Sequence, residues 1–283
     1  MMETGVQGIT RFLRRQQLLV AGGGLAALVV SATLAAPWLA SFPADAGGRV
    51  NLAQRLESPS RTHWLGTDEL GRDVFSRILY GTRISLAGGG GIVLLTALIG
   101  VPLGVLAGYY SGRFGESVMR AADLFMSIPY VPLAMALAAA LGPSLSNAVI
   151  ASAIPWWPWY ARVIRAEVLS LRERSFVDAA RAIGCSNGRI MVRHILPGCI
   201  PLILVQVTLQ VGLAILTLAA LSFLGLGPRP PTPELGLMIS LARNFLPNRW
   251  WLTVAPGLAI ALVVFAFNLL GDGMRDWLDP RSA

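Results

Sequence analysis

The chain has 283 residues, of which 54% are hydrophobic and only 13% are charged, and its mean hydropathy is +0.61. A soluble domain of this length cannot bury so much apolar surface, so the composition indicates an integral membrane protein. The net charge is +8, and every one of the 23 basic residues is arginine. Without lysine the chain can build neither an ATP-binding P-loop nor a Schiff-base site, so any ATP must be bound by a partner.

Long apolar runs predict six membrane-spanning helices, because a bilayer core of about 30 Å requires about 20 apolar residues in a helix. The expected spans are 17–40, 84–110, 119–141, 145–165, 200–225 and 251–271. The third and fourth spans share one apolar run, which Gly142-Pro143-Ser144 is expected to divide with a tight turn. The fold class is therefore an all-α polytopic membrane protein.

The first span and the arginines predict the orientation of the chain. Ala44-Asp45-Ala46 resembles a signal-peptide cleavage site, but the preceding apolar stretch is too long for a signal peptide, so an uncleaved anchor is expected. With both termini in the cytoplasm, more than half of the arginines lie on the cytoplasmic side, as the positive-inside rule requires. The cytoplasmic parts are then the N-terminal tail, the 111–118 loop, the 166–198 segment and the C-terminal tail.

Two of the expected spans carry groups of small or aromatic residues. Gly100, Gly104 and Gly108 share one helix face, and ordinary close packing against another helix is their expected use. In the fourth span, three tryptophans are interleaved with two prolines: Trp156, Trp157, Trp159, Pro155 and Pro158. An aromatic belt at the membrane interface is expected of these tryptophans, and ligand stacking is the alternative.

The fifth span carries polar side chains within its apolar run. Gln206 and Gln210 are four residues apart and Thr217 is seven residues further on, so the three fall near one helix face. Polar groups inside a membrane usually face a cavity or another helix. These residues are candidates for lining a solute pathway, and interhelical hydrogen bonding is the alternative.

The cysteines and histidines do not have the spacing of a metal site. Cys185 and Cys199 are expected to be packing residues. His63 precedes an acidic cluster at 68–73, which would be the alternative location for a metal. A structural outer loop is the expected interpretation of that cluster.

The 166–198 segment is polar and lies between two spans. Ser175 is expected to cap a short helix over 176–183, with Asp178 completing a variant capping box and Gly184 ending the helix. The exposed face is expected to comprise Phe176, Ala179 and Ala180. A groove on a soluble partner would bind such a face, and a loop that merely lies on the membrane is the alternative.

This segment resembles the EAA loop of ABC-importer permeases, in which Glu-Ala-Ala is followed by Gly and then by Ile-x-Leu-Pro. The corresponding residues are Asp178-Ala179-Ala180, Gly184 and His194-Ile195-Leu196-Pro197. Asp178 replaces the Glu and keeps its charge, whereas His194 replaces the first Ile beyond the docking helix. The resemblance implies that an ATPase couples to this loop through Ser175, Phe176, Asp178, Ala179, Ala180, Gly184, Leu196 and Pro197.

Other motifs narrow the resemblance. They are HWLGTDELGRD at 63–73, SFLGLG at 222–227 and AFNLLGD at 266–272. Together they resemble the second permease subunit of the dipeptide/oligopeptide/nickel branch of ABC importers, over nearly the whole chain. The implied fold is the type I ABC importer permease (MetI-like) fold, with six transmembrane helices and a cytoplasmic coupling helix.

The resemblance also implies a domain organisation. The cytoplasmic tail, the anchor helix and the start of the outer segment occupy 1–60, and the outer GTDELGRD-type segment occupies 61–81. The ABC transmembrane type-1 permease domain is expected over 82–272, with the EAA loop at about 166–198. A cytoplasmic tail is expected over 273–283.

The implied function is a permease of the bacterial inner membrane for short peptides delivered by an extracytoplasmic binding protein. Its implied partners are a homologous permease and two cytoplasmic ATPases, which would hold ATP and Mg²⁺. The chain itself is expected to be no enzyme and to bind no cofactor or metal. Nickel and glutathione are alternative solutes, and a stand-alone secondary transporter or channel is the alternative of another class. A membrane-embedded enzyme has no supporting motif.

Overall fold

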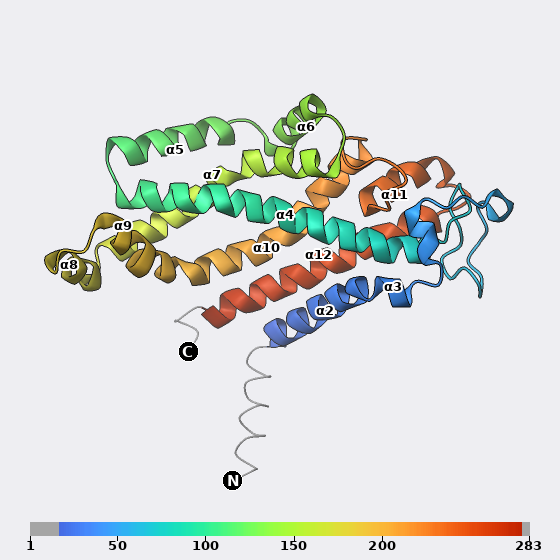
Figure 1. Cartoon of the computed structure of the whole chain (residues 1–283), viewed down its shortest axis with the longest axis horizontal. Helices are drawn as coiled ribbons and strands as arrows, with labels where there is room; N and C mark the ends of the chain where they lie inside the picture. Colours follow the sequence, from blue (N-terminus) through green and yellow to red (C-terminus); the bar gives the residue numbers. More distant parts are fainter. Residues whose placement is uncertain (1–16, 279–283) are drawn as a thin grey trace, which may run out of the picture.

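A computed structural model describes residues 17–278. The expected N-terminal tail over 1–16 and the last part of the expected C-terminal tail, 279–283, lie outside the described residues. Long helices lie side by side and form the body of the molecule (Figure 1). They are α2 (Gln17–Leu34), α4 (Val74–Tyr109), α7 (Leu145–Arg172), α10 (Leu196–Phe223) and α12 (Trp251–Leu278).

Shorter helices cover one side and both ends of this body. Helices α5 (Arg113–Met126) and α6 (Tyr130–Leu141) pack on α7 (Figure 1). One end carries α8 (Ser175–Ala182), α9 (Asn187–Ile190) and a π-helical turn (Met191–Ile195) that continues into α10. The opposite end carries α3 (Ala36–Leu39), α11 (Leu235–Ala242) and the irregular segment between α3 and α4.

The number of spans agrees only in part with the six expected. Within the described residues, four helices are long and apolar enough to cross a membrane, and the bent pair α5 and α6 would make five. The remaining candidate, α7, is 28 residues long but carries four charged residues in its second half. The all-helical membrane fold is therefore confirmed, whereas the count of six is not fully confirmed.

The third expected span, 119–141, is not one helix. The chain breaks between α5 and α6, whose axes differ by 85°. Pro129 is the reason in the sequence, because the residue before a proline is disfavoured in a helical conformation. In addition, α5 is amphipathic and is much less apolar than α6, because it carries four charged side chains: Arg113, Glu116, Arg120 and Asp123.

Several helix ends differ from the expected bounds. Helix α4 begins at Val74 rather than at 84, because Asp73 caps it by accepting a 2.7 Å hydrogen bond from the backbone N–H of Ser76. Helix α7 continues to Arg172 rather than 165, and α12 continues to Leu278 rather than 271.

The turn at 142–144 is confirmed. Gly142 has a φ of 84° and ends α6. Ser144 then caps α7 by accepting a hydrogen bond from the backbone N–H of Asn147 at 3.1 Å. The two helices on either side of this turn pack against each other.

The glycine face of α4 is a packing surface, as expected. Cβ atoms added at Gly100, Gly104 and Gly108 would lie 2.5, 2.8 and 2.7 Å from atoms of Tyr160, Ala161 and Val168 on α7. Real Cβ atoms do not approach so closely, so the glycines allow α4 and α7 to come into backbone contact. Helices α2 and α12 approach each other in the same way at Gly22 and Gly273.

Candidate functional site

Helix α8 lies at one end of the bundle, in the segment that sequence reasoning singled out. Its N-cap is Arg174 and not Ser175, which is already the first helical residue and makes no capping hydrogen bond. Asp178 is therefore too far into the helix for a capping box, and its carboxylate instead accepts a 3.1 Å hydrogen bond from Arg181. The predicted cap is wrong by one residue, but the predicted helix is confirmed.

The end of α8 follows the sequence prediction. Gly184 has a φ of 79°, a left-handed conformation that glycine adopts without strain. The N–H groups of Gly184 and Cys185 donate to the carbonyls of Arg181 and Ala180 at 2.9 and 3.0 Å. This pair of bonds is a Schellman motif, which closes the helix and turns the chain back toward the bundle.

The two faces of α8 differ in exposure. Phe176 is 40% exposed and Ile183, directly after the helix, is 80% exposed, whereas Ala180 is only 4% exposed. The sequence analysis placed Ala180 on the exposed face, and this prediction is wrong, because Ala180 is buried. It shares the inner face with Val177, three residues earlier, because each helical residue rotates about 100° around the axis. Phe176, Ala179 and Ile183 are exposed and lie near one side of the helix. The other exposed residues of α8 are Ser175, Asp178, Arg181 and Ala182.

The inner face of α8 is packed against the main helices. Val177 and Ala180 belong to one buried cluster with residues of α4, α7 and α10: Val105, Tyr109, Ile164, Val168 and Cys199. The Tyr109 hydroxyl donates to the Asn187 side chain at 2.8 Å, and the Arg181 guanidinium lies 5.9 Å from the centre of the Tyr109 ring. A displacement of α8 must therefore displace the adjoining ends of α4, α7 and α10.

The remaining candidate coupling residues lie at the start of α10. Leu196 and Pro197 are the first residues of α10 and directly follow the π-helical turn Met191–Ile195. Leu196 packs against the cluster beneath α8, whereas Pro197 is exposed. The roles predicted for the eight coupling-loop residues remain predictions.

A cavity of about 550 Å³ opens between the α5–α6 break, α7 and α10. Pockets of about 300–1,000 Å³ commonly accommodate small molecules. The lining is largely apolar, with a few polar groups. It consists of Phe125, Met126, Ile128, Pro129, Tyr130, Pro155, Trp156, Trp159, Gln206, Leu209, Gln210 and Leu213.

The candidate pathway residues of α10 separate into two groups. Gln206 and Gln210 both line the cavity. Gln206 also accepts a hydrogen bond from the indole N–H of Trp159 at 3.3 Å. It therefore both lines the cavity and forms a hydrogen bond between two helices. Thr217 is buried outside the lining and bonds the hydroxyl of Tyr130, which does line the cavity.

The tryptophans of α7 do not form the expected belt at a membrane interface. Trp156 and Trp157 are buried between helices. Trp156 lies 5.2 Å from Tyr130 between ring centres, and Trp157 contacts Phe125 edge-on at 5.7 Å. Trp156 and the half-exposed Trp159 line the cavity, which fits the ligand-stacking alternative.

Sequence reasoning missed the contribution of α5 and α6 to the cavity. Phe125, Met126 and Tyr130 lie on either side of the helix break and form one wall. Pro129 was the available signal, because a proline after a polar, amphipathic stretch favours a break over a continuous span. The charged pair Asp123 and Arg162 lies beside this wall and joins α5 to α7.

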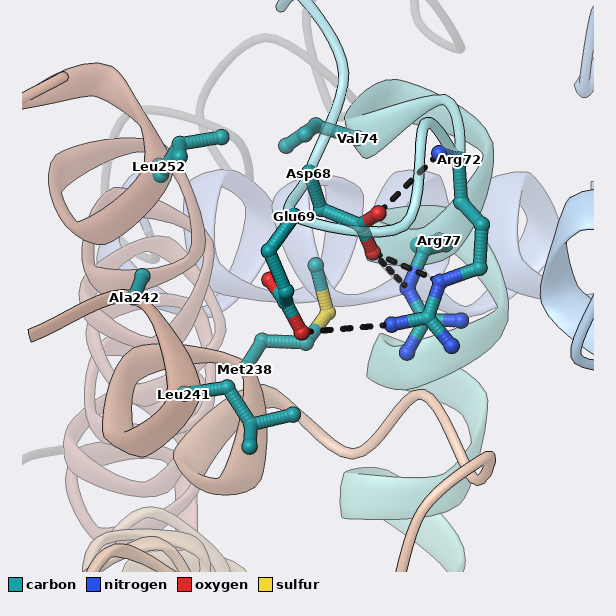
Figure 2. Close-up of a pocket in the computed structure, with 9 residues that line it drawn as sticks. All are labelled: Asp68, Glu69, Arg72, Val74, Arg77, Met238, Leu241, Ala242 and Leu252. Atoms are coloured by element: carbon teal, nitrogen blue, oxygen red, sulfur yellow. Dashed lines mark hydrogen bonds and ion pairs between the residues drawn. The ribbon is translucent and has the colours of Figure 1, made fainter. Parts of the chain in front are cut away.

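A buried charge cluster occupies the opposite end of the molecule (Figure 2). Asp68 accepts a 2.7 Å hydrogen bond from Nε of Arg72, and its carboxylate also lies 3.4 Å from Nε of Arg77. Glu69 lies 3.6 Å from Arg72. The backbone N–H groups of Leu70 and Arg72 donate to Asp68 as well, at 2.9 and 3.0 Å. The charges of the cluster are thus compensated internally.

The same segment is fixed to the start of α4 and to the chain before it. Nδ1 of His63 lies 2.9 Å from the Asp73 carboxylate, and the Asp73 N–H donates to Asp45 at 2.8 Å. Gly71 has a φ of 73°, and a Cβ there would overlap the carbonyl of Asn51. The motif residues therefore fold this segment into a compact cap.

This cap has the properties of a structural element. The cavity beside Asp68 and Arg77 measures about 20 Å³, which is room for about one water molecule. Among the described residues, no three His, Cys, Asp or Glu side chains are grouped as they would be around a metal ion. The Glu234 side chain anchors the neighbouring α11, which the sequence analysis did not predict, by accepting hydrogen bonds from Ser85 and from the N–H of Leu237.

Comparison with known proteins extends these observations. Residues 100–283 match the family described as "Binding-protein-dependent transport system inner membrane component". The fold resembles that of a permease chain in inward-facing conformations of the MetNI methionine ABC transporter, with a TM-score of 0.60 and 19% identity. That similarity covers 72% of this chain and 97% of the solved chain, so the MetI-like fold is confirmed.

Relatives match over nearly the whole chain. The glutathione transport system permease protein GsiD of Pectobacterium atrosepticum is 45% identical over 96% of this chain and 89% of the relative. The dipeptide transport system permease protein DppC of Alkalihalophilus pseudofirmus is 44% identical, over 95% and 88%. The probable D,D-dipeptide transport system permease protein DdpC of Escherichia coli is 42% identical, over 95% and 90%. The chain therefore belongs to the family of inner membrane components of binding-protein-dependent transport systems.

Proposed function

We propose that the chain is a permease subunit of an ABC importer for short peptides. The observation that carries this proposal is its similarity, over 95–96% of its length, to permeases named for dipeptide, D,D-dipeptide and glutathione transport. All these solutes are short peptides. Glutathione is thus the first alternative solute within the same class.

The cavity favours peptides over the nickel alternative. Its lining contains aromatic rings and the amides of Gln206 and Gln210, which suit the peptide group and apolar side chains. The lining contains no imidazole, thiolate or carboxylate, the ligands that transition metals select. In the assembled importer a homologous permease would complete the pathway on the open side of this cavity.

Energy must reach the pathway mechanically, because the chain lacks the lysine of an ATP-binding P-loop. We propose that α8 is the coupling helix and that Phe176, Ala179 and Ile183 enter a groove on an ATPase. The inner face of α8 would then transmit the movement of the ATPase to α4, α7 and α10. ATP and Mg²⁺ would be held by two such ATPases, and an extracytoplasmic binding protein would deliver the peptide.

The proposed topology places both termini in the cytoplasm of a bacterial cell, with the chain crossing the inner membrane several times. The last part of α12 packs on the start of α2, so the two ends of the described residues lie on the same part of the bundle. The arginine-rich segment around α8 lies in the half of the molecule that also contains the end of α12 (Figure 1). This distribution agrees with the positive-inside rule. The permease domain is proposed to comprise 82–272, and the tails and outer segments keep the expected bounds.

Purification of the tagged protein from its native cell in mild detergent tests the assembly. A second permease and two P-loop ATPases are expected among the recovered partners. The purified complex in proteoliposomes, with its binding protein, should take up radiolabelled dialanine only when ATP is supplied. Uptake by this chain alone, without ATP, would instead establish a secondary transporter, and uptake of ⁶³Ni²⁺ without dialanine would establish the nickel alternative.

A further inference from the structure

An ion pair joins α5 to α7 next to the cavity. The Arg162 guanidinium contacts the carboxylate of Asp123. Arg162 follows Trp159 by one helical turn, and Asp123 precedes Met126 by one turn; Trp159 and Met126 both line the cavity. The pair therefore lies one turn beyond the lining on both helices. On both helices, this turn lies between the cavity lining and the end of the bundle that carries α8 (Figure 1).

The pair is accessible to other charges. The side chain of Arg162 is 48% exposed and that of Asp123 is 63% exposed. Ion pairs with such exposure stabilise a fold only weakly, because water solvates the separated charges almost as well. Opening this pair therefore costs little, in contrast to the buried pairs of Asp68 with Arg72 and Arg77.

The cavity itself offers a charged solute no counter-charge. Its polar lining groups are neutral: the amides of Gln206 and Gln210, the Tyr130 hydroxyl and the indoles of Trp156 and Trp159. A short peptide at neutral pH carries an ammonium group and a carboxylate. The largely apolar lining stabilises neither charge, whereas a group of opposite charge binds each of them. Asp123 and Arg162 provide one charge of each sign directly beside the cavity.

We propose that Asp123 and Arg162 form a recognition site for zwitterionic solutes. The pair opens, the Arg162 guanidinium binds the carboxylate of the peptide, and the Asp123 carboxylate binds its ammonium group. Arginine suits this role because its planar set of N–H donors matches the two oxygens of a carboxylate. One ion pair is exchanged for two, and the original pair re-forms when the peptide leaves. This inference rests on the proposed function and assigns the residues that determine specificity within it.

The test compares free and blocked peptides in the full importer, reconstituted in proteoliposomes with its partners. Initial ATP-driven uptake rates are measured for dialanine, dialanine amide and N-acetyl-dialanine at concentrations that saturate the binding protein. The same binding protein is present in every assay. Its own preference therefore cancels when the ratio of two rates is compared between permease variants.

The wild-type importer is expected to take up dialanine faster than either blocked peptide. Arg162→Gln should lower the ratio of dialanine to dialanine amide by about three- to tenfold, because one charge-assisted contact is lost. Asp123→Asn should lower the ratio of dialanine to N-acetyl-dialanine by a similar factor. Arg120→Gln removes the same charge from α5 one turn further from the cavity and should leave both ratios unchanged.

Equal slowing of free and blocked peptides by Arg162→Gln would overturn the inference, because it would show that the pair only holds α5 against α7. Wild-type uptake rates for all three peptides in both Arg162→Gln and Asp123→Asn would overturn it as well. If the Arg162→Gln complex does not assemble, the ratio of dialanine to N-acetyl-dialanine uptake in Asp123→Asn tests the inference independently. Wild-type uptake without any preference contradicts this inference alone. A wild-type complex that assembles but takes up none of the three peptides contradicts the proposed function.

Discussion

Trp159 of α7 and Gln206 of α10 are joined by a hydrogen bond in the wall of the cavity, at 3.3 Å between the indole nitrogen and the amide oxygen. This bond fixes two helices to each other where the proposed pathway passes. Gln210 lies one turn further along α10 and also lines the cavity. Its side chain makes no hydrogen bond to another described residue, so its amide is available to a solute.

Replacing Gln210 with leucine tests the pathway. Gln210→Leu should slow ATP-driven dialanine uptake several-fold, because it removes a hydrogen-bonding group that no protein partner occupies. The thermal midpoint of the complex in detergent should stay unchanged for the same reason. Thr208→Val is the control, since Thr208 lies on the same helix outside the lining. Unchanged uptake and substrate range in both Gln206→Leu and Gln210→Leu would refute the pathway assignment.

Two neighbouring alanines on α8 provide a matched test of coupling. Ala179→Trp changes the exposed face and should abolish stimulation of the ATPase by the loaded binding protein, while the permease remains stable. Ala180→Trp instead overfills the cluster around Val177 and should destabilise the permease by about 1–3 kcal/mol. Thermal unfolding and ATPase assays on both variants distinguish the effects. Normal coupled transport by Ala179→Trp at normal membrane levels would contradict docking through this face.

The orientation of Ala180 shows where sequence reasoning reached its limit. The motif and Gly184 were sufficient to locate α8 and its end, because capping and turn chemistry are local. Which face of an eight-residue helix is buried depends on the side chains that surround it, here Val105 and Ile164. These residues are distant in the sequence, so a pattern within α8 does not reveal them.

The same distinction explains the errors elsewhere. Long apolar runs located α2, α10 and α12, although not all of their ends, since a span requires only length and hydropathy. Pro129 was a local signal for the break between α5 and α6, which the length of the apolar run obscured. The burial of Trp156 instead depends on how α6 and α7 pack together, which composition does not determine. Gln206 and Gln210 were identified as pathway candidates because helical spacing alone places them on one face.

The approach of α4 to α7 predicts a contrast between two glycines. A methyl group at Gly104 would lie 2.8 Å from the carbonyl oxygen of Ala161, whereas one at Gly90 has no atom within 4 Å. Gly104→Ala should therefore lower the stability of the permease by about 1–3 kcal/mol by forcing the helices apart. Gly90→Ala should leave it unchanged or raise it by up to about 1 kcal/mol, because alanine favours a helix. Thermal unfolding in detergent measures both, and equal midpoints would contradict the close approach.

The charge cluster of the cap predicts a severe loss of stability when its central carboxylate is removed. Asp68→Ala would leave Arg72 and Arg77, each 2% exposed, without their shared counter-charge. Removing one partner of a buried ion pair commonly costs about 3–5 kcal/mol. Asp68→Asn should cost less, because its amide oxygen can still accept from the N–H groups of Leu70 and Arg72. Arg61→Ala, at an exposed position of the same segment, is the control and should behave like the wild type. Limited proteolysis of the 40–73 segment and thermal unfolding report the change. Wild-type resistance to protease in Asp68→Ala would show that the cap does not depend on this cluster.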